Sequence, residues 1–209
     1  METTGTEERP AREVTERAGI TAAGHKFSVK LLPREAAADG ALLSALTNMV
    51  NEAFAQSERG ILADGAFRAS TADMAALTRT GEIAMASQDD RPLGCIRIRR
   101  LDSSSCQFGM LAADPGHRGI GIGRELIRFA EQQARDLGCR VAQLEVLVPV
   151  GWKHPAKEFL DQWYSQMDYK FTSTAPVAAV DPDLPPRLAV PCQFRIYRKD
   201  IGTSSRTAA

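Results

Sequence analysis

A glycine-rich segment in the middle of the chain has the residue types of an anion-binding site. Residues 115–124 contain four glycines and two arginines, which are Gly116, Arg118, Gly119, Gly121, Gly123 and Arg124. Glycines leave backbone N–H groups unscreened and permit positive φ angles. An amphipathic helix is predicted directly after the segment, which would put these N–H groups at the positive end of its dipole. The chemistry that fits is phosphate binding, with Arg118 and Arg124 adding charge-assisted hydrogen bonds.

Two common phosphate-binding loops do not match this segment. The Walker pattern needs Gly-Lys followed by Ser or Thr, and the chain contains no such tripeptide. The dinucleotide fingerprint Gly-x-Gly-x-x-Gly fails by one residue, because Gly119 and Gly121 are followed by Gly123. A glycine-rich helix start without any ligand is the structural alternative, although so many glycines cost stability.

Hydrophobic periodicity predicts the elements that must position this segment. Strands are expected at 26–32, 83–86, 94–101, 106–112, 140–148, 169–173 and 193–198, and helices at 36–55, 71–81, 124–137 and 157–167. The order is a strand, two helices, three antiparallel strands, and then helix, strand, helix and two strands. We therefore expect an α/β protein in α+β layers, with a mixed, mostly antiparallel central sheet of about six to seven strands flanked by about four helices.

The pattern Arg118-x-x-Gly121-x-Gly123, between a strand and a long amphipathic helix, resembles the acetyl-coenzyme A motif of the GNAT superfamily of N-acetyltransferases. The similarity covers residues 26–198 and includes the order of the elements and the segment 163–169. It implies the acyl-CoA N-acyltransferase fold, whose sheet splays to admit the cofactor from one side and an amine from the other. It also implies a site for acetyl-CoA as co-substrate, with no metal. Its residues would be Leu111, Ala112, Ala113, Arg118, Gly119, Ile120, Gly121, Ile122, Gly123 and Arg124.

Tyr164 is the candidate general acid. The resemblance places a tyrosine at this position, and a hydroxyl near the sulfur can protonate the departing coenzyme A thiolate. The alternative is a tyrosine that packs at the edge of an amphipathic helix beside Trp163.

The general base is less sharply indicated. An amine acceptor is mostly protonated at neutral pH, since the pKa of a lysine-like amine is about 10, so a proton must leave first. Glu145 on the central strand is the first candidate, unless it pairs outward with Arg140 or Arg97. Glu82 is the second candidate and a water chain the third. The family often uses a carboxylate on the strand before the motif, but 106–111 contains none.

Composition argues against several classes of partner. The chain has 26 Lys and Arg against 26 Asp and Glu, so its formal net charge is zero. A neutral total disfavours nucleic acid and an anionic membrane, but not a small anion held by local groups. No run approaches the roughly 18 apolar residues of a membrane helix. Four widely spaced cysteines without a leader segment indicate reduced thiols, so we expect a cytoplasmic protein.

The expected organisation is one acetyltransferase domain over 26–200, between a flexible arm at 1–25 and a flexible tail at 201–209. The predicted function is direct transfer of an acetyl group to a primary amine of a small molecule or peptide. The loops at 57–68 and 175–191 would hold this acceptor. A non-catalytic coenzyme A-binding module is the alternative, and the glycine spacing disfavours a nucleotide-binding redox domain. The resemblance is compatible with a monomer or a homodimer.

Overall fold

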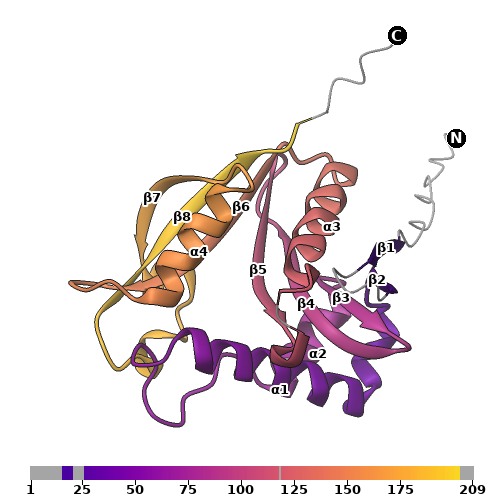
Figure 1. Cartoon of the computed structure of the whole chain (residues 1–209), viewed down its shortest axis with the longest axis horizontal. Helices are drawn as coiled ribbons and strands as arrows, with labels where there is room; N and C mark the ends of the chain where they lie inside the picture. The colour runs from indigo at the N-terminus through magenta and orange to yellow at the C-terminus, as the bar shows by residue number, and fades with distance from the viewer. Residues whose placement is uncertain (1–15, 21–25, 118, 203–209) are drawn as a thin grey trace, which may run out of the picture.

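The computed structural model describes residues 16–20, 26–117 and 119–202, and its elements follow the predicted order (Figure 1). The strands are β1 (Glu16–Ile20), β2 (Lys26–Leu31), β3 (Ile83–Gln88), β4 (Arg91–Arg100), β5 (Ser105–Ala113), β6 (Val141–Pro149), β7 (Lys170–Pro176) and β8 (Cys192–Asp200). The α-helices are α1 (Gly40–Ser57), α2 (Thr71–Arg79), α3 (Ile122–Asp136), α4 (Pro155–Ser165) and α5 (Val177–Val180). Short 3-10 helices at Arg34–Ala38, Pro115–His117 and Pro185–Arg187 lie between them.

The described strands form one eight-stranded sheet in the order β1-β2-β3-β4-β5-β6-β8-β7. Its pairs are antiparallel except β5 with β6, which confirms the predicted mixed, mostly antiparallel sheet. The strand count exceeds the expected six to seven because Glu16–Ile20, assigned to the arm, pairs with β2 as an edge strand. Five residues are too few to give a clear alternation. The rest of the predicted arm and most of the tail lie outside the described residues.

The 175–191 segment also differs from a simple loop. It contains the one-turn helix α5 and the 3-10 helix Pro185–Arg187. This brings the α-helices of the described chain to five rather than about four. Helices this short give no periodic pattern, so the sequence could not mark them.

The parallel strands β5 and β6 separate halfway along their length. They pair only from Ser105 opposite Val141 to Phe108 opposite Leu144, and then diverge as each continues to its end (Figure 1). Beyond this point β5 stays with β4, and β6 stays with β8. The sheet is therefore split into two halves that are joined at one end.

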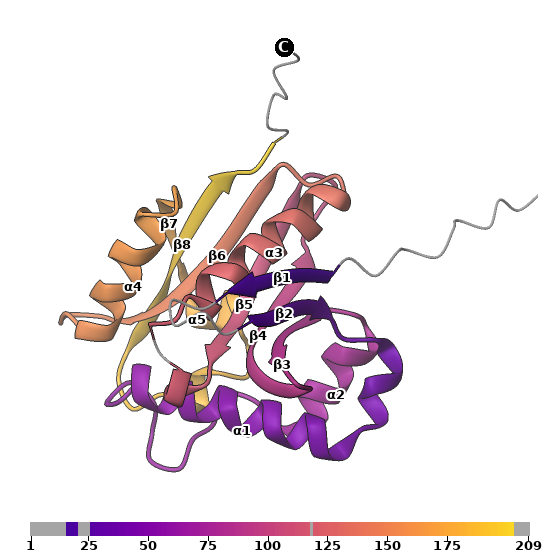
Figure 2. The same cartoon turned by 45° about the vertical axis from the view of Figure 1, so that its right-hand side comes forward.

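Helices cover both faces of the sheet (Figure 2). On one face, α3 buries Leu126 and Phe129 in a core that includes Phe108 and Leu144, and α4 packs against the same core. On the other face, α1 and α2 bury a second core, which includes Leu46, Met74, Met85 and Cys95. The split between β5 and β6 is thus bordered by helices of both layers.

Within the described residues, no helix is both long and apolar enough to cross a membrane. The same residues contain no group of three or more His, Cys, Asp and Glu side chains placed to hold a metal ion.

Candidate active site

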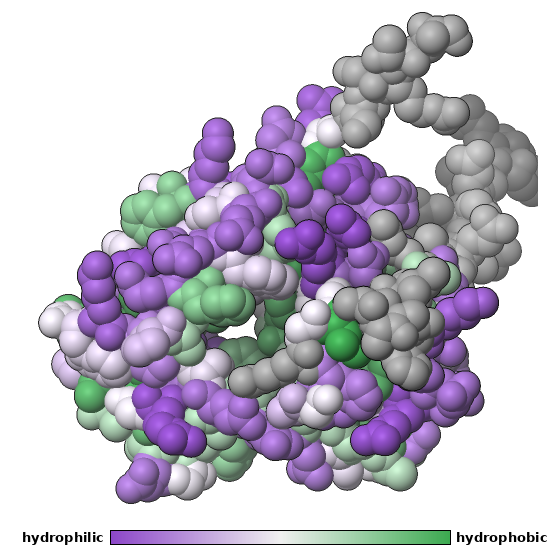
Figure 3. Space-filling view, in the orientation of Figure 1, coloured by the Kyte–Doolittle hydropathy of each residue, from purple (hydrophilic) through white to green (hydrophobic). Residues whose placement is uncertain are grey.

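A cavity of about 1240 Å³ follows the split in the sheet. It begins at the first turn of α3, passes between β5 and β6, and ends at the segments that follow α1 and β7. Figure 3 shows the molecule hollowed at this place, with an opening that runs through it. Two molecules can therefore reach the middle of the cavity from different sides.

The glycine-rich segment forms a turn that only glycine adopts without strain. Gly119 has a φ of 78°, and Gly121, the N-cap of α3, has a φ of 95°. A Cβ at either position would meet no heavy atom within 4 Å, so backbone conformation rather than packing requires glycine. The first N–H groups of a helix have no acceptor within the helix. At this end of the cavity they are available to an oxyanion.

Strand β5 carries a bulge where it leaves β6. Cys95 lies opposite Ala112 and Arg97 opposite Gly109, so Met110 and Leu111 together face one residue of β4. Met110 has a φ of 51°, in the left-handed region. Bulges re-aim backbone groups and are frequent next to active sites. Past the bulge, the edge of β5 that faces the gap pairs with no described strand, so an extended molecule can add to it.

The predicted cofactor-binding residues lie together along this half of the cavity, with one exception. Leu111, Ala112 and Ala113 line it from β5, and Gly119, Ile120, Gly121, Ile122, Gly123 and Arg124 line it from the start of α3. Ile122 is only 2% exposed and belongs to the core, so its backbone is the part that can contact a ligand. Arg118 lies outside the described residues, and its role stays a prediction.

Tyr164 lies on α4 and lines the middle of the cavity. Its side chain is 7% exposed, and its ring lies 4.9 Å from that of Trp163 and 6.4 Å from that of Tyr197. Burial raises the pKa of Tyr164 well above its usual value, and Tyr197 adds to the effect. The hydroxyl therefore stays protonated at neutral pH, as a general acid must. Tyr164 therefore does both things that were expected of it as alternatives: it packs beside Trp163 and it lines the cavity.

Glu145 lies directly after Leu144, the last residue of β6 that pairs with β5, and it lines the cavity. Gln107 and Gln143 each donate a side-chain hydrogen bond to one of its oxygens, the latter at 2.7 Å. Side chains alternate along a strand, so Glu145 points away from the core that holds Leu144 and Tyr164. The two candidate catalytic groups therefore reach the cavity from opposite faces of the sheet.

Two alternatives concern these carboxylates: that Glu145 pairs outward with Arg140 or Arg97, and that Glu82 is the base. Among the described residues, Glu145 forms no ion pair with Arg140 or Arg97. Arg97 binds Glu82 instead, with Nε 2.6 Å from Oε2. Glu82 is not among the residues that line the cavity, so of the two candidate bases only Glu145 lines it.

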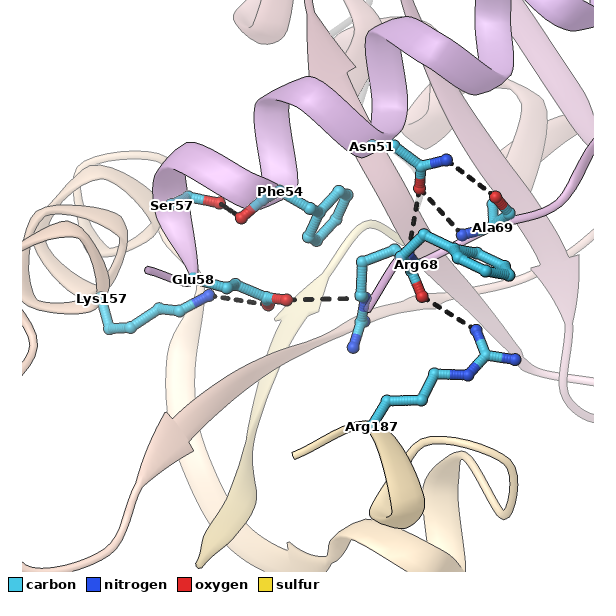
Figure 4. Close-up of polar contacts among 9 residues, drawn as sticks. Asn51, Phe54, Ser57, Glu58, Arg68, Ala69, Lys157 and Arg187 are labelled. Carbon is cyan, nitrogen blue, oxygen red and sulfur yellow. Dashed lines mark hydrogen bonds and ion pairs between the residues drawn. The ribbon is translucent and has the colours of Figure 1, made fainter. Parts of the chain in front are cut away.

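A buried charged cluster, at the end of the cavity that borders the C-terminus of α1, was not predicted from the sequence (Figure 4). Glu58, which follows α1, has its Oε1 2.9 Å from Nζ of Lys157 on α4 and its Oε2 3.7 Å from Nε of Arg68. Burial lowers the pKa of Lys157, and the charge of Glu58 opposes this shift. The partners lie 99 residues apart and in no motif, so the sequence carries no signal for the pair.

Comparisons with known proteins agree with this architecture. No curated protein sequence matches the chain. Solved structures do match: an N-acetyltransferase from Staphylococcus aureus Mu50 has 14% identity and a TM-score of 0.58, covering 84% of this chain and 98% of that one. Ard1 from Thermoplasma volcanium has 12% identity and a TM-score of 0.57, covering 83% and 97%.

A third similar structure is an aminoglycoside 6'-N-acetyltransferase complexed with coenzyme A. It has 14% identity and a TM-score of 0.58, with 78% of this chain and 92% of that one covered. At such identities these likenesses show the fold. The family is shown by a sequence match of residues 46–151, about half of the chain, to the model of the acetyltransferase (GNAT) family. The chain belongs to the GNAT acetyltransferase family.

Proposed function

We propose that the protein transfers an acetyl group from acetyl-coenzyme A directly to a primary amine of a small molecule or peptide. The observation that carries the proposal is the continuity of the cavity. It joins the glycine-rich start of α3 to the acceptor face of the sheet, with Tyr164 and Glu145 on its walls. A module that only bound coenzyme A would not need a second opening or an ionisable group on the acceptor side.

The residues present fit coenzyme A. The turn at Gly119 and Gly121 leaves open space beside the first N–H groups of α3, which suits a pyrophosphate. The unpaired edge of β5 after the bulge suits an extended pantetheine arm. The ring of Trp163, on α4, packs close to Gly123, since a Cβ added at Gly123 would lie 3.5 Å from this ring. Trp163 therefore borders the turn on the side of α4.

Each candidate catalytic side chain has a defined task in this proposal. When bound, acetyl-coenzyme A supplies a thioester carbonyl that an amine can attack. Glu145 accepts the proton that the acceptor ammonium must lose, while Gln107 and Gln143 hold its two oxygens. Tyr164 donates its hydroxyl proton to the sulfur as the C–S bond breaks and the C–N bond forms, and the second proton that the attacking nitrogen loses restores the tyrosine hydroxyl.

Ligand-induced thermal stabilisation tests the cofactor part of the proposal. A ligand at 100 times its dissociation constant adds about 2.7 kcal/mol to the free energy of unfolding. Acetyl-coenzyme A is expected to raise the melting temperature, whereas NADH and ATP at equal concentration leave it nearly unchanged. A protein that acetyl-coenzyme A does not stabilise would contradict the proposal.

A further inference from the structure

The two segments expected to hold the acceptor meet at the far end of the cavity. Leu62 and Leu188 form an isolated antiparallel bridge, and the N–H of Ala189 donates to the carbonyl of Ile61 at 2.9 Å. The segment after α1 and the segment after α5 are therefore joined into one wall. Each contributes an arginine to the cavity lining, Arg68 from the first and Arg187 from the second.

Arg68 is held in place through its backbone and its guanidinium group. The Oδ1 of Asn51 accepts hydrogen bonds from the N–H groups of Arg68 and Ala69, both at 3.0 Å, and its Nδ2 donates to the carbonyl of Ala69 at 2.8 Å (Figure 4). The guanidinium lies over the ring of Phe54, 5.0 Å from its centre. These contacts fix the side chain before any ligand arrives, which lowers the entropic cost of binding.

The carboxylate beside Arg68 does not satisfy it. Glu58 is shared between Lys157, whose Nζ lies 2.9 Å from Oε1, and Arg68, whose Nε lies 3.7 Å from Oε2. The longer distance exceeds that of a hydrogen bond, and in the described chain Oε2 of Glu58 is buried without a hydrogen-bond partner. In the described part of the chain, Nη1 of Arg68 is buried and has no hydrogen-bond partner. A buried donor left without a partner costs free energy, so a ligand oxygen that supplied one would be bound favourably.

Arg187 adds a second positive charge. Its Nη1 donates to the carbonyl of Phe67 at 2.9 Å, and its guanidinium lies 5.1 Å from the centre of the Phe67 ring. The nearby Asp73 is engaged in capping α2, since its Oδ2 accepts from the N–H and the hydroxyl of Ser70. Asp181 and Asp183 also line the cavity from the segment of Arg187, but the described chain contains no ion pair between either of them and Arg68 or Arg187.

We propose that Arg68 and Arg187 bind a carboxylate of the acceptor, so that the acceptor is an amino acid or a short peptide that carries both an amine and a carboxylate. This inference rests on the proposed function and names its substrate class. The planar guanidinium fork matches a carboxylate and discriminates strongly against an analogue that lacks one. With the ammonium at Glu145 and the carboxylate at Arg68, the acceptor lies across the cavity between β6 and the wall formed by the two segments.

The experiment compares acceptors that differ only in this group. Amino acids and dipeptides with a free carboxylate are assayed beside their carboxamides, by release of the coenzyme A thiol from acetyl-coenzyme A. The wild-type protein is expected to favour the carboxylates by about tenfold or more in kcat/KM. Arg68→Gln is expected to lose about 10- to 100-fold for the carboxylates, mainly in KM, and less than twofold for the carboxamides.

Arg79→Gln is the matched control, because Arg79 lies in the last turn of α2 and does not line the cavity. It should leave both rates unchanged. Arg68→Lys keeps the positive charge and shows whether the loss of kcat/KM in Arg68→Gln reflects folding. Stabilisation by acetyl-coenzyme A is also measured for each variant. Equal loss for carboxylates and carboxamides in Arg68→Gln would overturn the inference. A wild-type protein that acetylates carboxamides equally well would also overturn it. Failure to bind acetyl-coenzyme A, or to acetylate any acceptor, would instead refute the proposed function.

Discussion

The Nζ of Lys157 lies 2.9 Å from Oε1 of Glu58, and the two side chains are only 4% and 1% exposed. The pair connects α4 to the residue that follows α1, so it ties together elements on the two sides of the split sheet. A buried ion pair adds little net stability, but the loss of one partner leaves an uncompensated charge. Its main consequence here is to fix the wall of the cavity at the acceptor end.

Lys157→Met should therefore destabilise the protein markedly. The unpaired Glu58 carboxylate, with only the distant Nε of Arg68 beside it, is expected to lower the free energy of unfolding by about 3 kcal/mol. Urea denaturation measures this change. The double variant Lys157→Met/Glu58→Gln carries no buried charge at the pair and should recover part of the loss. Equal destabilisation in the single and double variants would show that lost packing, rather than an unpaired charge, is responsible.

Gly121→Ala should weaken cofactor binding beyond its effect on stability. The φ of 95° at Gly121 disfavours any residue with a Cβ, at a cost of about 1–2 kcal/mol. Gly138, just after the other end of α3, has a φ of 81° and similarly open surroundings, so Gly138→Ala is a matched control. Both variants should lose similar stability in urea. Only Gly121→Ala should bind acetyl-coenzyme A less tightly in calorimetry, and a similar loss of affinity in both would count against a phosphate site at this turn.

The larger elements, and the residues that line one half of the cavity, could be predicted from the sequence because both depend on local patterns. The inner face of α3 shows the 3.6-residue period, and the turn before it is marked by glycines that its φ angles require. The acceptor half depends on long-range contacts instead. Two of these contacts are the ion pair of Glu58 with Lys157 and the hydrogen bond from Asn51 to Ala69. Each joins residues that no spacing rule connects. The bulge at Met110 was also missed, since a positive φ at methionine has no compositional signal.

Glu145→Gln should lower turnover by about 10²-fold at neutral pH, because the amide cannot accept the ammonium proton. The loss should shrink as the pH rises toward the pKa of the acceptor amine, where the free amine becomes abundant. Rates of thiol release between about pH 6 and 10 measure this. Glu82→Gln serves as the control, since Glu82 pairs with Arg97 and does not line the cavity. If Glu145→Gln retained full activity at every pH, another group or a water chain would be the base.

Asp114→Asn should reduce the sensitivity of the fold to acid. A hydrogen bond from the N–H of Gly116, together with His117 and Arg91, holds the pKa of Asp114 below its ordinary value. The ionised carboxylate therefore stabilises the fold above that ordinary value, and the contribution is lost as the pH falls through the lowered pKa. Urea denaturation from about pH 5 to 2 should show a shallower decline for Asp114→Asn than for wild type. An unchanged slope in Asp114→Asn would contradict the assignment.

The most direct measurement is the yield of N-acetyl product per coenzyme A thiol released, with amino acids and short peptides as acceptors. We predict one N-acetylated amine for each thiol in the wild-type protein. Tyr164→Phe should give the same ratio with a kcat about 10²-fold lower and unchanged affinity for acetyl-coenzyme A, because only the proton donor is lost. Tight binding of acetyl-coenzyme A without N-acetylated product from any amine would contradict the account.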